Sequence, residues 1–258
     1  MADSLEGRHA VVTGGGRGIG AAIAEALAGA GSRLTVMGRN RDAIEAEAAK
    51  LRRSAQAQAV DLDVAEPESV ARAFARATEV FGPPAILINN AGQAASAPFP
   101  KTDMALWRRM LDVNLTGTFL CAQAALAGML AGGYGRIVNI ASIAGLAGAP
   151  YVAAYCAAKH GVIGLTRALA LEFARKNITV NAVCPAYTET DMVGAAVANI
   201  VAKTGRSADE ARAELVRRNP QCRLMQPQEV ANAVLWLCLP GSEAITGQAI
   251  SVSGGEVM

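Results

Sequence analysis

Two side chains with acid–base chemistry lie four residues apart in a segment whose pattern is typical of a helix, Tyr155 and Lys159. Residues four apart on a helix share one face, so both side chains can reach a common point. A phenol has a pKa of about 10 and transfers protons poorly at neutral pH, but a neighbouring ammonium group favours the phenolate and lowers that pKa. The spacing therefore predicts a tyrosine that acts as a general acid or base.

A hydroxyl group follows the predicted strand Arg136–Ala141, on Ser142. From the end of a strand it can hydrogen-bond a substrate oxygen and stabilise the charge that develops there. Neighbouring reactive residue types are expected to have other roles. Cys156 and Cys184 have no evident basic partner, so we interpret them as packing groups rather than nucleophiles.

The cysteines and histidines do not form a metal-binding pattern. The five cysteines are widely spaced and include no C-x-x-C pair, and the chain has two histidines, His9 and His160. This usage suits reduced thiols better than disulfides or a zinc site, so we expect no bound metal.

A glycine-rich segment, Thr13–Gly20, joins a predicted strand to a predicted Ala-rich helix. A turn of this kind lets the backbone approach a pyrophosphate, and the free N–H groups and dipole of the helix favour its negative charge. Glycine clusters alone are weak signals, but the order of strand, turn and helix predicts dinucleotide binding.

Short apolar, β-branched runs alternate with longer helical patterns along the whole chain. The predicted strands are His9–Thr13, Arg33–Met37, Ala57–Asp61, Ala85–Asn89, Arg136–Ala141, Thr179–Val183 and Ala249–Val252. The predicted helices are Ile19–Ala30, Arg41–Arg53, Glu68–Val80, Met104–Leu130, Val152–Lys176 and Glu229–Leu237. Most strands are apolar on both faces, as in parallel sheets covered by helices. The pattern predicts an α/β fold, a doubly wound seven-stranded parallel sheet with helices on both faces, forming one domain over residues 1–258.

One stretch, residues 186–220, fits this alternation poorly because it is mixed in polarity and lies between the sixth strand and the last helix. A surface excursion is one interpretation. We favour a substrate lid, since a segment placed there can cover a site at the strand ends.

The spaced elements together resemble the short-chain dehydrogenase/reductase family. In chain order they are Gly14, Gly18 and Gly20 as G-x-x-x-G-x-G, Asn89-Asn90-Ala91-Gly92, Asn114, Ser142, and Tyr155-x-x-x-Lys159. The resemblance covers essentially the whole chain and implies a Rossmann-type fold. It also implies hydride transfer between a nicotinamide cofactor and a carbonyl or secondary alcohol. An oxidised nicotinamide close to the phenol would, together with the ammonium group, favour the phenolate and lower the pKa of Tyr155.

The resemblance assigns site residues one by one. The catalytic set is Asn114, Ser142, Tyr155 and Lys159, where Asn114 is similar to the residue that holds a water behind the lysine. The residues assigned to the cofactor are Gly14, Gly16, Arg17, Gly18, Ile19, Gly20, Arg39, Asp63, Val64, Asn90, Ala91, Gly92, Tyr155, Lys159, Pro185, Ala186, Thr188 and Thr190. Asp61 competes with Asp63 for the adenine contact.

One departure from the family is Ala186, because the family usually has Pro-Gly where this chain has Pro185-Ala186. The added methyl could narrow the nicotinamide pocket or restrict the loop, since glycine reaches more backbone angles.

The second predicted strand is followed by Gly38-Arg39-Asn40, with no acid placed to accept hydrogen bonds from a ribose 2′-hydroxyl. Arg39 and Arg17 instead suit a 2′-phosphate, which needs charge-assisted donors. NADP(H) is therefore the favoured cofactor, while NAD(H) stays open because either arginine can be a solvated surface charge.

The pattern is most similar to 3-oxoacyl-thioester reductases, particularly in Arg17, Arg39, Asn181-Ala182-Val183 and Gly254-Gly255. Residues 131–135 are uncharged, whereas enzymes acting on carrier proteins tend to have basic residues there. We therefore expect a CoA thioester or a related free ketone. Two alternatives stay open: an oxidative alcohol or ring-diol dehydrogenase that uses NAD, and a non-catalytic dinucleotide-sensing protein.

Charge is scarce, at 18% of residues with a net charge of +2, which argues against a nucleic-acid partner. Between Asp112 and Lys159 the one charged residue is Arg136. The two uncharged runs are long enough to cross a bilayer, but polar residues, glycines and Pro150 interrupt them, so we expect no membrane span. No signal peptide is visible, which predicts a cytoplasmic protein. The resemblance implies a homotetramer in which this poorly charged region packs against partner chains.

Overall fold

The computed structural model describes residues 5–258, which are built around one parallel sheet. Its strands are β1 His9–Thr13, β2 Arg33–Gly38, β3 Ala57–Asp61, β4 Ile86–Asn89, β5 Gly135–Ile140, β6 Ile178–Pro185 and β7 Ala249–Val252. Their spatial order is β3-β2-β1-β4-β5-β6-β7. Strands β1 to β3 are added towards one edge of the sheet and β4 to β7 towards the other, so the order of addition reverses between β1 and β4. A crevice is expected outside the carboxyl ends of the strands at that point.

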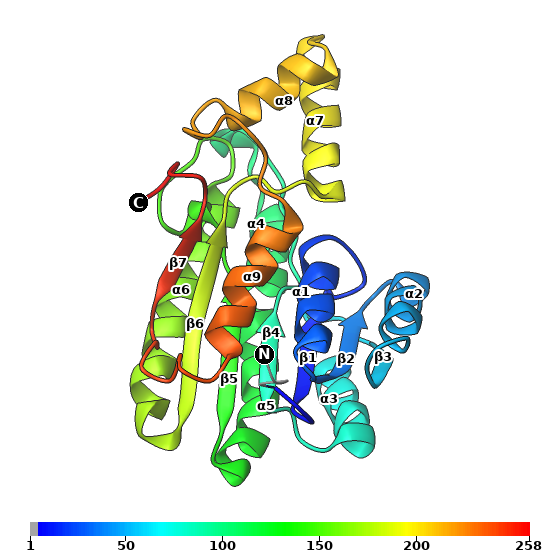
Figure 1. The fold of residues 1–258 in the computed structure, drawn as a ribbon. Helices are drawn as coiled ribbons and strands as arrows, with labels where there is room; N and C mark the ends of the chain where they lie inside the picture. The colour runs from blue at the N-terminus through cyan, green and yellow to red at the C-terminus, as the bar shows by residue number, and fades with distance from the viewer. Residues whose placement is uncertain (1–4) are drawn as a thin grey trace.

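Helices cover both faces of the sheet (Figure 1). They are α1 Gly18–Gly29, α2 Arg41–Leu51, α3 Pro67–Phe81, α4 Met104–Leu111, α5 Gly117–Gly132, α6 Ala153–Phe173, α7 Asp191–Thr204, α8 Ala208–Val216 and α9 Pro227–Cys238. On one face α1 and α9 pack on each other and on an apolar core that includes Ile23, Leu27 and Val234. On the other, α3, α5 and α6 bury a second core that includes Phe74, Cys121 and Ala170.

The predicted fold class is confirmed, and all seven strands lie where the sequence places them. β1, β3 and β7 have the predicted bounds, and the others differ at their ends; β6, for example, extends to Pro185. Strand ends depend on pairing with neighbours, which a local pattern does not specify. Pro185, for instance, continues β6 because Val252 of β7 lies opposite it.

The helix predicted over Met104–Leu130 is divided. α4 and α5 are joined by a single π turn, Asp112–Thr116, in which the N–H of Gly117 donates to the carbonyl of Asp112, five residues earlier. Such turns occur frequently at functional sites. Met104–Gly132 as a whole is long and apolar enough to cross a membrane by length and composition alone. Here Cys121, Ala122 and Ala125 of this helix pack in the core against the sheet.

The segment 186–220 forms two helices, α7 and α8, which stand beyond the carboxyl ends of the strands (Figure 1). They enclose a small apolar cluster of their own, including Val193, Val197 and Ala211. The position is the one expected of a lid, although its movement stays a prediction.

Candidate functional site

The glycine-rich turn connects β1 to α1 and is closely packed against the segment that follows β4. A Cβ on Gly14 would lie 2.9 Å from the Cα of Ala91, and one on Gly20 would lie 2.3 Å from the carbonyl oxygen of Gly14. Gly14 and Gly18 also have positive φ angles, 63° and 56°. Glycine is required at these positions because a side chain would clash or be strained.

Side chains behind the turn hold it in place. The side-chain amide of Asn90 donates to the carbonyls of Thr13 and Gly14, both at 3.0 Å. The Thr13 hydroxyl accepts from the backbone N–H groups of Asn90 and Ala91. The predicted residues of the two segments are thus brought together. Sequence reasoning missed Thr13, whose position directly before the glycines was the available signal.

This turn fits the phosphates of a dinucleotide. No side chain caps the N-terminus of α1, and its first turn holds no acidic residue, so its N–H groups and dipole are available to an anion. Because the glycines carry no side chains, a pyrophosphate can approach the backbone of the turn closely. Gly14 to Gly20 would hold that part of the cofactor.

The loop after β6 reaches the same turn. The side-chain methyl of Thr190 would lie 3.1 Å from a Cβ on Gly18, and Asp191, the first residue of α7, forms an ion pair of 2.8 Å with Arg17. Thr188 is buried and donates from its hydroxyl to the carbonyl of Ala186. Of the predicted cofactor residues of this loop, Thr190 therefore lies beside the glycine turn, and Asp191 is a neighbour that the sequence did not indicate.

Ala186 does not need the freedom of glycine. It is buried, its N–H donates to Val252 at 3.1 Å, and its φ angle is not among the positive values of the described chain. Narrowing of the nicotinamide pocket and restriction of the loop by this methyl therefore stay predictions. Alanine adopts this conformation without strain.

The strand ends of β2 and β3 carry the residues assigned to the adenosine. Arg39 follows β2 and its guanidinium lies 3.9 Å from the carboxylate of Asp63, which follows β3. Both side chains are well exposed, so solvent screens the pair and it contributes little. Arg39 is thus available to a phosphate, while Val64 is buried against Gly117.

Ser142, Tyr155 and Lys159 converge at the end of β5. The Lys159 amine lies 5.7 Å from the centre of the Tyr155 ring and donates to the carbonyl of Ile140 at 2.8 Å. The Ser142 hydroxyl accepts from the N–H of Ala144, which orients it at the start of a short 3₁₀ turn. The predicted one-face arrangement on α6 is present in the structure.

Burial shifts the pKa values of both Tyr155 and Lys159. Burial raises the pKa of Tyr155 to about 12, and interaction with the Ser142 side chain opposes this less strongly. Burial also lowers the pKa of Lys159 to about 8, because a buried ammonium loses solvation. The lowered pKa predicted from the sequence requires an oxidised nicotinamide beside the phenol as well as the lysine, and it stays a prediction.

Asn114 lies in the π turn and is fully buried. Its side-chain amide donates to the carbonyls of Gln93 and Met110, both at 2.9 Å, and its carbonyl oxygen accepts from the N–H of Gln93. A Cβ on Gly92 would lie 2.9 Å from that oxygen and 3.7 Å from the Lys159 amine. Asn114 and Lys159 therefore meet around Gly92, and Gln93 joins them as a contact the sequence analysis did not single out.

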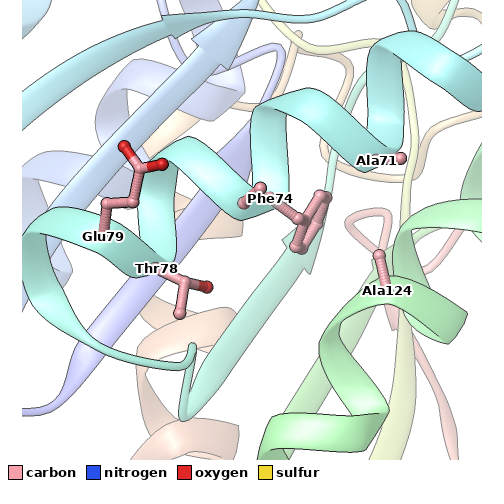
Figure 2. A pocket seen from close by; sticks show the side chains of 6 residues that line it. Ala71, Phe74, Thr78, Glu79 and Ala124 are labelled. Carbon is pink, nitrogen blue, oxygen red and sulfur yellow. The ribbon is translucent and has the colours of Figure 1, made fainter.

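Two surface hollows lie elsewhere. Figure 2 shows one between α3 and α5, lined by Phe74, Thr78, Glu79 and small residues including Ala124. Its ionisable group, Glu79, is paired with Arg76, so it offers little chemistry.

The second hollow lies on the lid and is lined by Arg212, Arg217 and Arg223. Each of these arginines is paired with a carboxylate, on Glu189, Glu214 and Glu229 respectively. These arginines therefore form surface ion pairs in the structure and do not present an unpaired cluster to a phosphate.

The chain is similar to known proteins over nearly its whole length. Residues 14–256 match the family model described as Enoyl-(Acyl carrier protein) reductase. A 3-oxoacyl-[acyl-carrier-protein] reductase of Aquifex aeolicus is 38% identical over 99% of this chain and 99% of its own length. The 2-(S)-hydroxypropyl-CoM dehydrogenase 3 of Xanthobacter autotrophicus is 36% identical over 99% of this chain and 98% of its own.

A solved structure is similarly close. The crystal structure of a variant of actinorhodin polyketide ketoreductase with NADPH superimposes with a TM-score of 0.94 at 39% identity, covering 99% of both chains.

Proposed function

Because the chain belongs to the short-chain dehydrogenase/reductase family and is an oxidoreductase, we propose that it reduces a 3-oxoacyl thioester of CoA, or a related ketone, with NADPH. The observation that carries the proposal is the meeting of Ser142, Tyr155 and Lys159 at the end of β5, beside a bare glycine turn. A proton donor, a donor to an oxyanion and a cationic group are the three parts that carbonyl reduction requires of a protein.

In the proposed reaction the bound nicotinamide supplies the hydride. Tyr155 donates its phenolic proton to the carbonyl oxygen, and the Ser142 hydroxyl hydrogen-bonds that oxygen as charge develops on it. Lys159 stays positioned by the carbonyl of Ile140 at 2.8 Å and stabilises the phenolate left behind. Asn114, which meets Lys159 around Gly92, supports the return of a proton to the tyrosine. The oxidation of an alcohol follows the same steps in reverse.

We propose NADP(H) as the cofactor because two exposed guanidinium groups flank the place for the adenosine. Arg17 lies at the glycine turn and Arg39 at the end of β2, and their carboxylate partners, Asp191 and Asp63, are themselves exposed. Exposed ion pairs are weak, so a 2′-phosphate can replace the carboxylates with charge-assisted hydrogen bonds.

The substrate is tested by a screen of NADPH and NADH against acetoacetyl-CoA, longer 3-oxoacyl thioesters and simple ketones. We expect reduction of acetoacetyl-CoA or a ketone with a lower KM for NADPH than for NADH. Turnover with no member of the panel, together with tight NADPH binding, would overturn the proposal in favour of a dinucleotide-sensing protein.

A second candidate is an alcohol dehydrogenase working oxidatively with NAD. It is favoured by the close relative of Xanthobacter, whose name describes a dehydrogenase. The same screen run with secondary and ring alcohols and NAD separates the two, because the pair of substrate and cofactor with the highest kcat/KM differs between the two candidates.

We also propose a cytoplasmic homotetramer, with residues 186–220 as its substrate lid and no nucleic-acid or membrane partner. Large apolar side chains exposed on α5 and α6 support the assembly: Phe119, Leu130 and Leu171, the last 84% exposed. Such groups are typical of surfaces covered by another subunit.

A further inference from the structure

A row of buried polar side chains runs beneath the proposed catalytic residues, from α5 to α6. The Asn89 amide donates to the carbonyl of Thr118 at 3.4 Å and to the side-chain oxygen of Asn139 at 2.9 Å. The Asn139 amide donates to the Thr166 hydroxyl at 2.9 Å, and that hydroxyl donates to the carbonyl of Val162 at 2.8 Å. The row crosses β4 and β5, where Asn89 and Asn139 lie side by side.

These polar groups stand in an apolar layer. Asn139 and Thr166 have no exposed surface, and Asn89 has 4%. Leu87 and Ile137, two residues earlier on the same strands, belong to the surrounding core. Burial of an amide is unfavourable, and its hydrogen bonds do little more than offset that free energy. Apolar residues of the same shape would therefore make the folded protein about as stable. A connected polar row instead fixes one arrangement of the elements, and in this row the side-chain oxygen of Asn89 has no hydrogen-bond partner among the described residues.

The two ends of the row reach the proposed site. At one end the Thr118 hydroxyl donates at 2.9 Å to the carbonyl of Asn114 in the π turn. At the other end Thr166 lies seven residues, about two turns, beyond Lys159, on the same face of α6. Asn139 directly precedes Ile140, whose carbonyl accepts the Lys159 amine. The row thus ties both helices that carry site residues to the strand that orients Lys159.

We infer that Thr118, Asn89, Asn139 and Thr166 form a polar bridge that sets the position of Lys159 and Tyr155 relative to Asn114 and Ser142. The four are positioning residues, since none of them touches the reacting atoms. Sliding of α6 along β5 would break the bond between Asn139 and Thr166 and move the Lys159 amine from Ile140. A misplacement of about 1 Å can lower a rate about 100-fold. This inference rests on the proposed function, because it assigns the bridge to that reaction.

The test compares Thr166→Val, which removes the hydroxyl at nearly constant shape, with Thr166→Ser, which keeps it. With NADPH and acetoacetyl-CoA, or the ketone of the panel that the wild type reduces fastest, Thr166→Val should lower kcat about tenfold or more. The KM for NADPH should change less than about threefold, because the glycine turn is not part of the bridge. Thr166→Ser should restore kcat to within about threefold of the wild type.

Thr35→Val is the matched control, because Thr35 is also a fully buried, hydrogen-bonded threonine but lies on β2. It should lower Tm and leave kcat unchanged at temperatures well below unfolding. Thr118→Val removes the hydroxyl bond to the carbonyl of Asn114 and keeps the carbonyl that Asn89 contacts, and it should also lower kcat. Combined with Thr166→Val it should cost less than the product of the two effects, since each interrupts the connection between Asn114 and Lys159.

Wild-type kcat in Thr166→Val, or an equal loss in Thr35→Val, would overturn the bridge. If Thr166→Val does not fold, multiplicative effects in the pair Thr118→Val and Thr166→Ala would overturn it. Failure of the proposed function is recognised separately, because then the wild type turns over no member of the panel, or Tyr155→Phe retains the activity of the wild type whatever the bridge variants do.

Discussion

At the scale of single residues, the proposed chemistry depends on two groups whose burial opposes their function. The pKa of Tyr155 is raised to about 12 and that of Lys159 is lowered to about 8. Both shifts have the same cause, the loss of solvation of a charged form, so at neutral pH the phenol is protonated and the Lys159 amine is still mostly charged. The acid–base role of Tyr155 therefore depends on the groups held around it.

Replacement of Tyr155 by phenylalanine tests that role directly. The ring stays and the proton donor is lost, so kcat should fall by about 10²- to 10⁴-fold, the usual contribution of a general acid. NADPH affinity, measured by fluorescence titration, should stay within about twofold, because the phosphates are held at the glycine turn. Retained turnover would refute the assignment of Tyr155 as the proton donor.

Cofactor choice is also decided by single side chains. Arg39→Asp removes a donor to the 2′-phosphate and adds an acceptor for a ribose hydroxyl, so the KM for NADPH should rise about 10- to 100-fold while that for NADH falls. Steady-state kinetics with both cofactors measure the change. Arg53→Asp, which makes the same charge change just beyond the other end of α2, should alter neither KM. An unchanged preference in Arg39→Asp would refute the phosphate assignment.

At the scale of elements, local pattern predicted the sheet well because each parallel strand is apolar on both faces and flanked by turn residues. β1, for example, is buried at all five positions. Pattern could not predict the π turn at Asp112–Thr116, because one extra residue per turn leaves the composition of the helix unchanged. Long-range partners were also hidden: Arg17 meets Asp191 and Asn139 meets Thr166 through the fold alone.

The amino ends of the strands carry a second buried polar chain, which supports the sheet rather than the site. His9 of β1 hydrogen-bonds the hydroxyl of Thr35 on β2 at 2.8 Å and the carbonyl of Gly82 at 2.7 Å. The Gln58 amide of β3 donates to the same hydroxyl at 3.0 Å. Three neighbouring strands are thus linked through the Thr35 hydroxyl, and burial lowers the pKa of the His9 imidazole from 6.5 to about 4.

This imidazole predicts a pH dependence of stability. In the unfolded chain His9 is protonated below about pH 6.5, whereas in the folded chain it is protonated only below about pH 4. The stability that His9 contributes is therefore complete above pH 6.5 and is lost as the pH falls towards 4. The loss should reach about 3 kcal/mol. Urea unfolding of the wild type and His9→Gln across this range measures it. A constant difference between the two proteins from pH 7 to pH 4 would contradict the linkage.

At the scale of the whole molecule, the segment between Asp112 and Lys159, which has few charged residues, lies in two kinds of environment. Part of the segment is buried inside the subunit, where β5 is buried at all six positions. Another part lies on the outer surface of α5, where Phe119 and Leu130 are 45% and 43% exposed. The inner part orders the proposed site, and the outer part has no covering within residues 5–258.

The outer part predicts assembly. In light scattering coupled to size exclusion, the wild type should have about four times the 26.5 kDa mass of one chain, because exposed large apolar groups on adjacent helices favour burial against identical surfaces. Leu171→Glu and Phe119→Glu should shift the mass to dimers or monomers, since a carboxylate is costly to bury in an interface. Val80→Glu, on α3, where Val80 is 48% exposed, should leave the mass unchanged. A monomeric wild type would refute the assembly without affecting the proposed chemistry, whose residues all come from one chain.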